Sequence, residues 1–334
     1  FSNGIHHHYG EEKFLPEFSK TFFTDQVRLL PAQVLPIREE ETVDHFLDKI
    51  IPVMFDPAIL SKKVNQTAAD IILSSSTNYY EEGITQQEVL DFYNTLKKED
   101  SASLISHGLN SRLTKDGTRL IEQIWKKGGM YSPAIEKIIY WLEKALVVSE
   151  NEEQKDVINK LVSFYNTGDL KTFDEYSIAW VKDTSSLVDF VNGFIEVYGD
   201  PLGMKASWES IVNFKNVEAT KRTEIISNNA QWFEDNSPVE NRFKKETVTG
   251  VTAKVITVVQ LGGDCYPATP IGINLPNADW IRKDYGSKSV TIENIMEAYD
   301  KASAHTGFSE EFFWSDNEIG LINKYGFITD VLHT

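Results

Sequence analysis

The sequence is nearly free of cysteine, with Cys265 alone among its 334 residues. A single cysteine cannot form an intramolecular disulfide, and structural zinc sites built on paired cysteines are excluded as well. Because disulfides are rare in reducing compartments, we expect a cytoplasmic protein. No basic partner for Cys265 is evident in the sequence, so we predict a buried, inert thiol rather than a nucleophile.

Long apolar runs and an excess of positive charge are also missing. No stretch of about 18 apolar residues predicts a membrane-spanning helix, and no charged and then apolar leader predicts a signal peptide. Lys and Arg number 33 against 50 Asp and Glu, which gives a formal net charge of −17. We therefore expect neither nucleic acid nor a membrane as partner, since phosphate binding depends on clustered Lys and Arg. A substrate that carries a cationic amine suits this charge better.

The common local catalytic motifs are absent. No H-E-x-x-H or H-x-x-E-H pattern places metal ligands on one helix face, and no G-x-S-x-G elbow occurs. Gly262-Gly263-Asp264 lacks the further glycine and the Lys-Ser/Thr pair of a phosphate-binding loop. The sequence therefore predicts no metal site formed by this chain. Its seven histidines are His6, His7, His8, His45, His107, His305 and His333.

Three of these histidines, His6, His7 and His8, follow one another near the start of the sequence. Neighbouring side chains point in different directions on a strand or helix, so such a run makes a poor set of metal ligands. We predict a loop whose rings pack or hydrogen-bond locally.

Helical patterns fill the first two-thirds of the sequence. Thr85-Gln86-Gln87-Glu88 is a capping box, with Ile84 and Val89 placed to form the hydrophobic staple around it. Ser132-Pro133 predicts a capping hydroxyl before a proline at the first helical position, and Gly168 predicts the end of another helix. A further amphipathic helix is predicted from Leu187 to Tyr198.

The pattern changes after about residue 246. Thr247 to Leu261 is rich in Val, Ile and Thr and predicts a strand, whereas helical spacing returns from Ile292 to Ala302. Asp200-Pro201-Leu202-Gly203 has the residue order of a type I turn. The predicted fold class is α+β and mostly helical.

Two polar clusters lie within apolar surroundings. The first holds Glu196 and Tyr198 and continues to Glu209, and the second holds Asn274 and Asn277. Taken in isolation, the carboxylate of Glu196 is typical of a solvated helix end. The two asparagines flank Pro276, and in isolation they are typical of turns.

Together the two clusters resemble the dipeptidyl peptidase III family of zinc metallopeptidases. The resemblance rests on F-I-E-V-Y-G-D-P-L-G-M-K-A-S-W-E from Phe194 to Glu209 and on I-G-I-N-L-P-N-A-D-W-I-R from Ile271 to Arg282. Gly286 to Val290, Asn294-Ile295 and the opening Phe1 to Tyr9 add to it. It extends over nearly the whole chain in consistent order.

The resemblance implies a two-lobed fold, with one lobe of helices and a small β-barrel and a second, helical lobe that carries zinc. Residues 1–216 and 258–303 would belong to the barrel-bearing lobe, 217–257 would cross into the zinc lobe, and 304–334 would begin it. The family's zinc motif, H-E-x-x-G-H, is absent. We therefore expect a fragment that is inactive by itself, with zinc present in the complete protein and bound by no residue of this chain.

The resemblance also implies roles for individual residues. Glu196, Asn274 and Asn277 match positions that bind the free α-ammonium of a peptide, which needs a carboxylate and neutral acceptors. Tyr198 matches the residue whose hydroxyl points to the scissile carbonyl. The backbone near Ile271 matches the strand edge along which the peptide lies. The implied substrate-binding residues are Glu196, Asn274, Asn277, Ile271, Gly272, Arg282 and Glu209.

The implied function is therefore that of the substrate-binding portion of a zinc-dependent dipeptidyl peptidase. Its partners would be short peptides with a free N-terminus, and the oligomeric state is not predicted. One alternative is a non-catalytic peptide-binding protein that lacks the metal site. A second is a helical interaction scaffold in which both polar clusters are ordinary turns.

Overall fold

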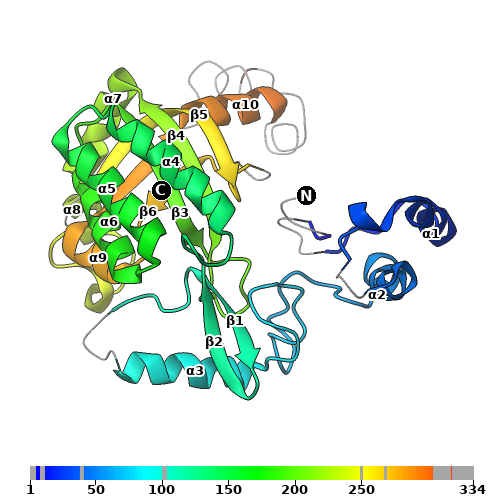
Figure 1. The fold of residues 1–334 in the computed structure, drawn as a ribbon. Coiled ribbons are helices and arrows are strands. Elements are labelled where there is room, and N and C mark those ends of the chain that lie inside the picture. The colour runs from blue at the N-terminus through cyan, green and yellow to red at the C-terminus, as the bar shows by residue number, and fades with distance from the viewer. Residues whose placement is uncertain are drawn as a thin grey trace. The chain divides into compact units, whose positions relative to one another are not determined.

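The computed structural model describes residues 5–7, 12–37, 41–99, 104–248, 251–266, 269–303 and 317. The chain forms two compact units (Figure 1). The first unit comprises Phe1–Glu99, Ser111–Gln123 and Glu196–Ala206; the second comprises Asp100–Asn110, Ile124–Ile195 and Ser207–Thr334. Within the described residues, no helix combines the length and the apolar character that a membrane span needs.

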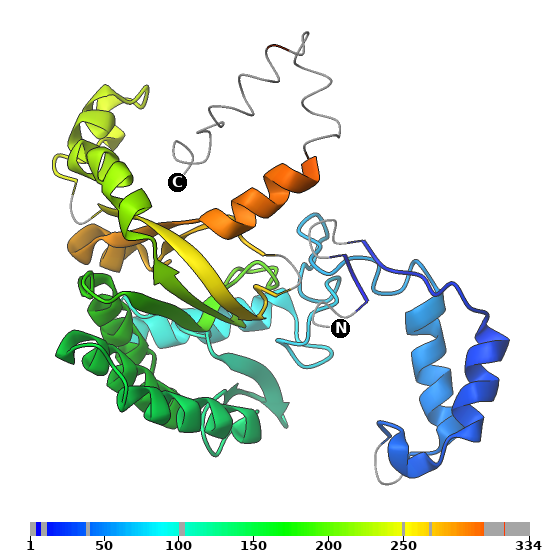
Figure 2. The same ribbon diagram turned by 90° about the horizontal axis from the view of Figure 1, so that it is seen from above.

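The first unit contains three α-helices among its described residues. They are α1 (Lys20–Leu29), which is followed by the 3-10 turn η1 (Ala32–Val34), α2 (Val43–Phe55) and α3 (Gln86–Glu99). Figure 2 shows α1 beside α2. The strands β1 (Ser111–Asp116) and β2 (Arg119–Ile124) form a two-stranded sheet.

The predicted capping box at the start of α3 is confirmed. The Thr85 amide donates to the Glu88 carboxylate at 2.8 Å, and the Glu88 amide donates to the Thr85 hydroxyl at 3.3 Å. Ile84 and Val89 are fully buried in one apolar cluster with Tyr80. These contacts satisfy amides that would otherwise lack partners at the helix start.

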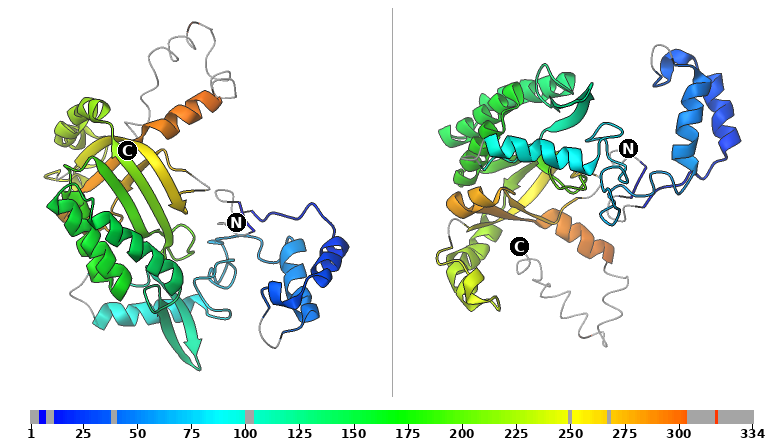
Figure 3. Two further views of the ribbon diagram at one scale, coloured as in Figure 1. Left: turned by 45° about the horizontal axis from the view of Figure 1, so that its top comes forward. Right: turned by 90° about the horizontal axis from the view of Figure 1, so that it is seen from below.

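In the second unit, α4 (Ser132–Leu146), α5 (Glu152–Thr167) and α6 (Leu170–Lys182) pack as consecutive neighbours (Figure 3). The α5 helix ends at Gly168, whose φ of 71° is left-handed, as the sequence predicts. The capping prediction for Ser132 is wrong. Tyr131 is the N-cap of α4, and the Ser132 hydroxyl donates to Glu136 at 2.8 Å instead.

The second unit is built around a five-stranded sheet in the order β3-β4-β5-β7-β6. Its strands are β3 (Val188–Glu196), β4 (Ser207–Lys215), β5 (Val251–Gly263), β6 (Gly272–Leu275) and β7 (Ser287–Ile292). β5 and β7 are parallel, whereas β4 with β5 and β6 with β7 are antiparallel. The strand predicted from Thr247 to Leu261 is confirmed as β5.

The helix predicted from Leu187 to Tyr198 is wrong, because Val188–Glu196 is the strand β3. The helical interpretation depended on polar residues at Asp189, Asn192 and Glu196, which follow one another at the three- and four-residue spacing of a helix face. In β3 the neighbouring residues Gly193 and Phe194 are both buried, so its burial does not alternate from one residue to the next as it does in a strand with one buried face.

The remaining helices of the second unit lie in the chain between the strands of this sheet or after the last of them. They are α7 (Val217–Asn228), α8 (Ala230–Asn236), α9 (Asp279–Tyr285) and α10 (Glu293–Ser303), with the 3-10 turn η2 (Asn241–Phe243). The helix predicted near Ile292–Ala302 is thereby confirmed as α10. The Thr220 hydroxyl of α7 accepts a hydrogen bond from the Val255 amide of β5 at 3.1 Å. The fold is α+β, as predicted, and residues 304–334 lie outside the described residues apart from Asn317.

Candidate substrate-binding site

The turn that follows Glu196 and Tyr198 in the first unit is organised around the carboxylate of Asp200. This carboxylate is buried and accepts hydrogen bonds from the Tyr80 hydroxyl at 2.9 Å, the Met204 amide at 2.8 Å and the Lys205 amide at 2.9 Å. The Gly203 amide donates to the Asp200 carbonyl at 2.9 Å, which confirms the predicted turn. Burial, together with the nearby Asp200 charge, raises the pKa of Tyr80.

Lys205 fixes the same turn to α3 and β1. Its fully buried ammonium donates to the Tyr93 hydroxyl at 2.6 Å and to the Ser111 carbonyl and hydroxyl at 3.0 Å each. Burial lowers the pKa of Lys205 to about 8, against the opposing attraction of Glu122 and Asp200. Nothing in the local sequence signals this role, because all of its partners are distant in the chain.

Replacing Asp200 with alanine should destabilise the first unit by about 3 kcal/mol or more. Four donors lose their acceptor, because the Leu202 amide also donates to this carboxylate, at 3.4 Å. Each buried unsatisfied group costs about 1–3 kcal/mol. Urea denaturation followed by circular dichroism would measure the change. Asp116→Ala, at an exposed position of β1, is the matched control and should shift stability by less than about 0.5 kcal/mol; equal effects of the two substitutions would contradict the anchoring role.

Tyr198 itself is 82% exposed, so its hydroxyl projects from a turn that is fixed from beneath. Glu196 is the last residue of β3 and is half-buried. Both residues belong to the first unit, whereas the other predicted substrate-binding residues belong to the second.

In the second unit, β6 lies at one end of the strand order and pairs with β7. Its second edge pairs with no strand among the residues that the structure describes. Ile271, just before β6, accepts a hydrogen bond from the Ile292 amide at 2.9 Å and is 42% exposed. Gly272 therefore begins a strand at the end of the described sheet, and Ile271 lies directly before it, where the family resemblance implies a strand edge.

Asn274 and Asn277 lie in and just after this edge strand. The Oδ1 atom of Asn274 is buried and has no hydrogen-bond donor within the described part of the chain. The side-chain amide of Asn277 donates to the backbone carbonyl of Ile195, the residue before Glu196, at 3.4 Å. The structure thus brings together Ile271, Gly272, Asn274 and Asn277 along one short segment.

Glu209 lies on β4 and is buried. The thiol of Cys265 donates to its carboxylate at 2.9 Å, so the predicted buried thiol is confirmed. The neighbouring backbone is tight, since a Cβ on Gly263 would lie 2.1 Å from the Trp208 carbonyl oxygen. Arg282 is half-buried in the last turn of α9.

No group of three His, Cys, Asp or Glu side chains that could hold a metal ion occurs among the described residues. His6 is buried and contacts the Leu60 carbonyl at 2.8 Å, and the ring of His7 lies 3.8 Å from that of Phe14. The ring of His7 packs locally, as predicted. The local contact predicted for His6 is wrong, because its ring contacts a residue 54 positions away in the sequence. His8 lies outside the described residues. The described residues do not fit a zinc ion, and we therefore derive no catalytic step through zinc.

Comparison with known proteins gives consistent matches. Residues 56–325 match the model of peptidase family M49. Dipeptidyl peptidase 3 of Dictyostelium discoideum is 26% identical over 313 residues, which cover 87% of this chain and 42% of that protein. The chain thus spans less than half the length of the curated relatives it matches.

Two solved structures share the fold. DPP III from Caldithrix abyssi has a TM-score of 0.62 and 18% identity, with 90% of this chain and 55% of that chain covered. Dipeptidyl-peptidase III from Corallococcus sp. strain EGB has a TM-score of 0.58 and 20% identity, with 67% and 41% covered. The resemblance found in the sequence is thereby confirmed.

Proposed function

The chain belongs to peptidase family M49, and we propose that it forms the substrate-binding portion of a zinc-dependent dipeptidyl peptidase that acts on short peptides with a free N-terminus. The proposal also includes a cytoplasmic location and the division into lobes at residues 216, 257 and 303. The family supports a peptidase function, and the arrangement of the edge strand supports the substrate-binding role.

The observation that carries this proposal is the buried Oδ1 atom of Asn274 on β6, which has no hydrogen-bond donor among the described residues. A buried acceptor without a donor costs free energy, and a bound donor recovers it. A peptide α-ammonium supplies up to three N–H donors. A peptide that pairs with β6 as a further strand would bring its main chain to the same segment.

The remaining roles follow the family positions. The carboxylate of Glu196 would form a charge-assisted hydrogen bond with the α-ammonium, and Asn277 would accept a further N–H. The exposed hydroxyl of Tyr198 would donate to the scissile carbonyl as negative charge develops on its oxygen. Ile271 and Gly272 would present the backbone edge, and Arg282 and Glu209 complete the proposed substrate-binding set.

In this proposal zinc belongs to the complete protein and is bound by no residue of this chain. Its ligands would come from residues other than those described. The chain's own contribution would be to bind the N-terminus, to align the peptide along β6 and to donate the Tyr198 hydroxyl. By this division of tasks, the chain by itself would bind peptides without cleaving them.

A non-catalytic peptide-binding protein is the second candidate, and the same Asn274 observation favours it, because ammonium binding needs no metal. Release of a dipeptidyl arylamide by a protein that joins this chain to the family's H-E-x-x-G-H segment separates the two candidates. Zinc-dependent release supports the peptidase, whereas peptide binding without release supports the binding protein.

Peptide binding by the chain tests the proposed site directly. We expect a tetrapeptide with a free N-terminus to bind at least about tenfold more tightly than its N-acetylated form, as judged by isothermal titration calorimetry. Asn274→Leu should weaken the binding of the free peptide roughly 5- to 10-fold, because one hydrogen-bond acceptor is lost.

The matched control is Asn213→Leu. Asn213 also has a buried Oδ1 atom without a donor among the described residues, but it lies on β4, between β3 and β5. Its replacement should leave peptide affinity unchanged. Equal binding of the free and acetylated peptides, or equal losses in the two variants, would remove the ammonium site from β6.

A further inference from the structure

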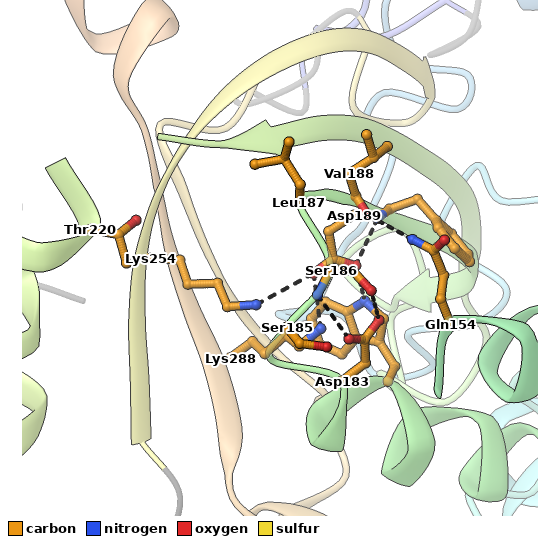
Figure 4. Close-up of polar contacts among 12 residues, drawn as sticks. Gln154, Asp183, Ser185, Ser186, Leu187, Val188, Asp189, Thr220, Lys254 and Lys288 are labelled. Carbon is orange, nitrogen blue, oxygen red and sulfur yellow. Dashed lines mark hydrogen bonds and ion pairs between the residues drawn. The ribbon is translucent and has the colours of Figure 1, made fainter. Parts of the chain in front are cut away.

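A buried group of charges lies within the second unit, where β3 begins (Figure 4). One carboxylate oxygen of Asp189 accepts a hydrogen bond from the Trp180 indole at 3.0 Å. The other accepts one from the Lys288 ammonium at 2.8 Å, and the Lys254 ammonium lies 3.9 Å from the same oxygen. The ammonium of Lys288 also lies 4.3 Å from the centre of the Trp180 ring. Lys288 is therefore the cation that Asp189 and Trp180 bind directly.

The two lysines share one face of the sheet. Lys254 of β5 is paired with Val290 of β7, and Lys288 lies two residues before Val290, so both side chains project from the face that carries Val290. Ile256, Val290 and Ile292 form a buried apolar cluster on the same face. Lys254 is 6% exposed and Lys288 is fully buried. Burial disfavours the charged form of the Lys254 amine, whereas Lys288 is compensated by its direct contact with Asp189.

The contact between Asp189 and Lys288 requires a curved sheet. Asp189 is on β3 and Lys288 is on β7, with β4 and β5 between them in the strand order. Three strand spacings amount to about 14 Å in a flat sheet. A direct contact between these side chains fits a sheet that curves toward the barrel that the family resemblance implies.

Lys254 and Lys288 share the carboxylate of Asp189, with Lys288 at 2.8 Å and Lys254 at 3.9 Å from the same oxygen. The charged groups that act on Lys254 are Asp183 and Asp189, which attract its proton, and Lys215 and Lys288, which repel it. With Lys254 included, three cations face two carboxylates. Asp189 binds Lys288 directly, and the carboxylate of Asp183 accepts hydrogen bonds from the Ser186 amide at 3.2 Å and hydroxyl at 2.7 Å. The ion pair of Asp189 with Lys288 is electrically balanced by itself and needs no charge on the Lys254 amine.

The electrostatics of the site agree with the charge count. Burial lowers the pKa of Lys254 to about 8, and repulsion by Lys288 adds to the effect. At pH 7 such an amine is neutral in a far larger fraction of molecules than a lysine with the usual pKa of about 10.4. The neutral form carries the lone pair that reacts, and a second nearby cation is a known means of producing it.

We propose that Lys254 is a nucleophilic amine and a covalent modification site for small carbonyl electrophiles. The ammonium first loses its proton to solvent. With isocyanic acid, the lone pair of the amine nitrogen then attacks the carbon and a C–N bond forms. The π bond between the carbon and nitrogen of the reagent breaks, and its electron pair takes up one N–H proton at the reagent nitrogen. The product is a neutral urea, and no leaving group or oxidant is needed. This site is independent of the proposed peptide-binding residues.

Cyanate labelling over a pH series, read by mass spectrometry of peptides, tests the proposal on the chain as it is. The exposed Lys137 of α4 is the internal reference. We expect the labelling rate of Lys254, corrected for the isocyanic acid concentration, to reach half its maximum near pH 8, whereas that of Lys137 rises through pH 10. The pH of the half-maximum does not depend on how readily the reagent reaches the amine. A profile parallel to that of Lys137, or no labelling of Lys254 at any pH, would overturn the proposal.

Two comparisons separate the site from general reactivity. Lys288→Met removes the adjacent cation and leaves Asp189 for Lys254, so labelling of Lys254 at pH 7 should fall at least about tenfold relative to Lys137. In denaturant, the two lysines should react at equal rates in the unchanged chain. An unchanged preference for Lys254 in either comparison would show that the buried group of charges does not cause the reactivity.

Discussion

Replacing Tyr198 with phenylalanine should lower kcat by roughly 10²- to 10³-fold in a protein that carries this chain together with the family's zinc residues. The hydroxyl would stabilise charge that develops only in the transition state, so its loss should leave KM within about a factor of two. Steady-state cleavage of a dipeptidyl arylamide measures both constants. The substitution should not disturb the surrounding fold, because Tyr198 is 82% exposed and the turn that carries it is held by hydrogen bonds to Asp200.

The matched control is Tyr140→Phe, which removes a hydroxyl from a tyrosine that is 51% exposed on α4. Both constants should stay unchanged in that variant. A loss confined to KM in Tyr198→Phe would assign the hydroxyl to ground-state binding rather than to the developing oxyanion. An unchanged kcat would remove Tyr198 from the reaction.

Local features of the fold could be read from the sequence because each depends on neighbouring residues. The capping box of Thr85 and Glu88 and the left-handed Gly168 are decided within one helical turn, and the structure contains both. The edge position of β6 has no local cause, because it depends on which strands pair. In the sequence it could be expected only through the family resemblance.

The strand β3 shows why the same local reasoning fails elsewhere. Its polar residues Asp189, Asn192 and Glu196 imitate a helix face, yet Asp189 binds Lys288 and Asn192 accepts from the Tyr165 hydroxyl. Both partners are distant in the sequence. When polar residues are satisfied by long-range contacts, their spacing in the sequence does not reveal whether they lie in a helix or in a strand.

The buried lysines could not be predicted from the sequence either, because their partners are also distant in the chain. Lys205 and Lys254 lie in segments whose composition is ordinary, and lysine is rarely buried unless paired. Lys205 is fully hydrogen-bonded, to Tyr93 and Ser111, and it fixes a turn. Lys254 has its nearest carboxylate oxygen at 3.9 Å. Burial lowers the pKa of each amine to about 8. The hydrogen bonds of Lys205 give it a structural role, whereas the weaker contact of Lys254 is consistent with the nucleophilic role proposed for it.

Replacing Glu196 with glutamine should weaken the binding of peptides with a free N-terminus by roughly 10- to 100-fold, because a charge-assisted hydrogen bond contributes about 1.5–3 kcal/mol. The substitution keeps the size of the side chain and removes only its charge. In calorimetric titrations, the N-acetylated peptide should bind the variant and the unchanged chain equally. The affinity ratio of free to acetylated peptide should therefore fall toward one.

The pH dependence of the same titration separates a charge effect from a change of shape. The α-ammonium of a peptide loses its proton near pH 8. Affinity for the free peptide should therefore be constant below about pH 7 and fall as the pH rises to 9, and Glu196→Gln should flatten this decline. Glu218→Gln, at an exposed position on α7, is the control and should leave the profile unchanged. If Glu196→Gln weakens both peptides equally at every pH, Glu196 holds the backbone in place, and the ammonium is bound by the asparagines of the edge strand without it.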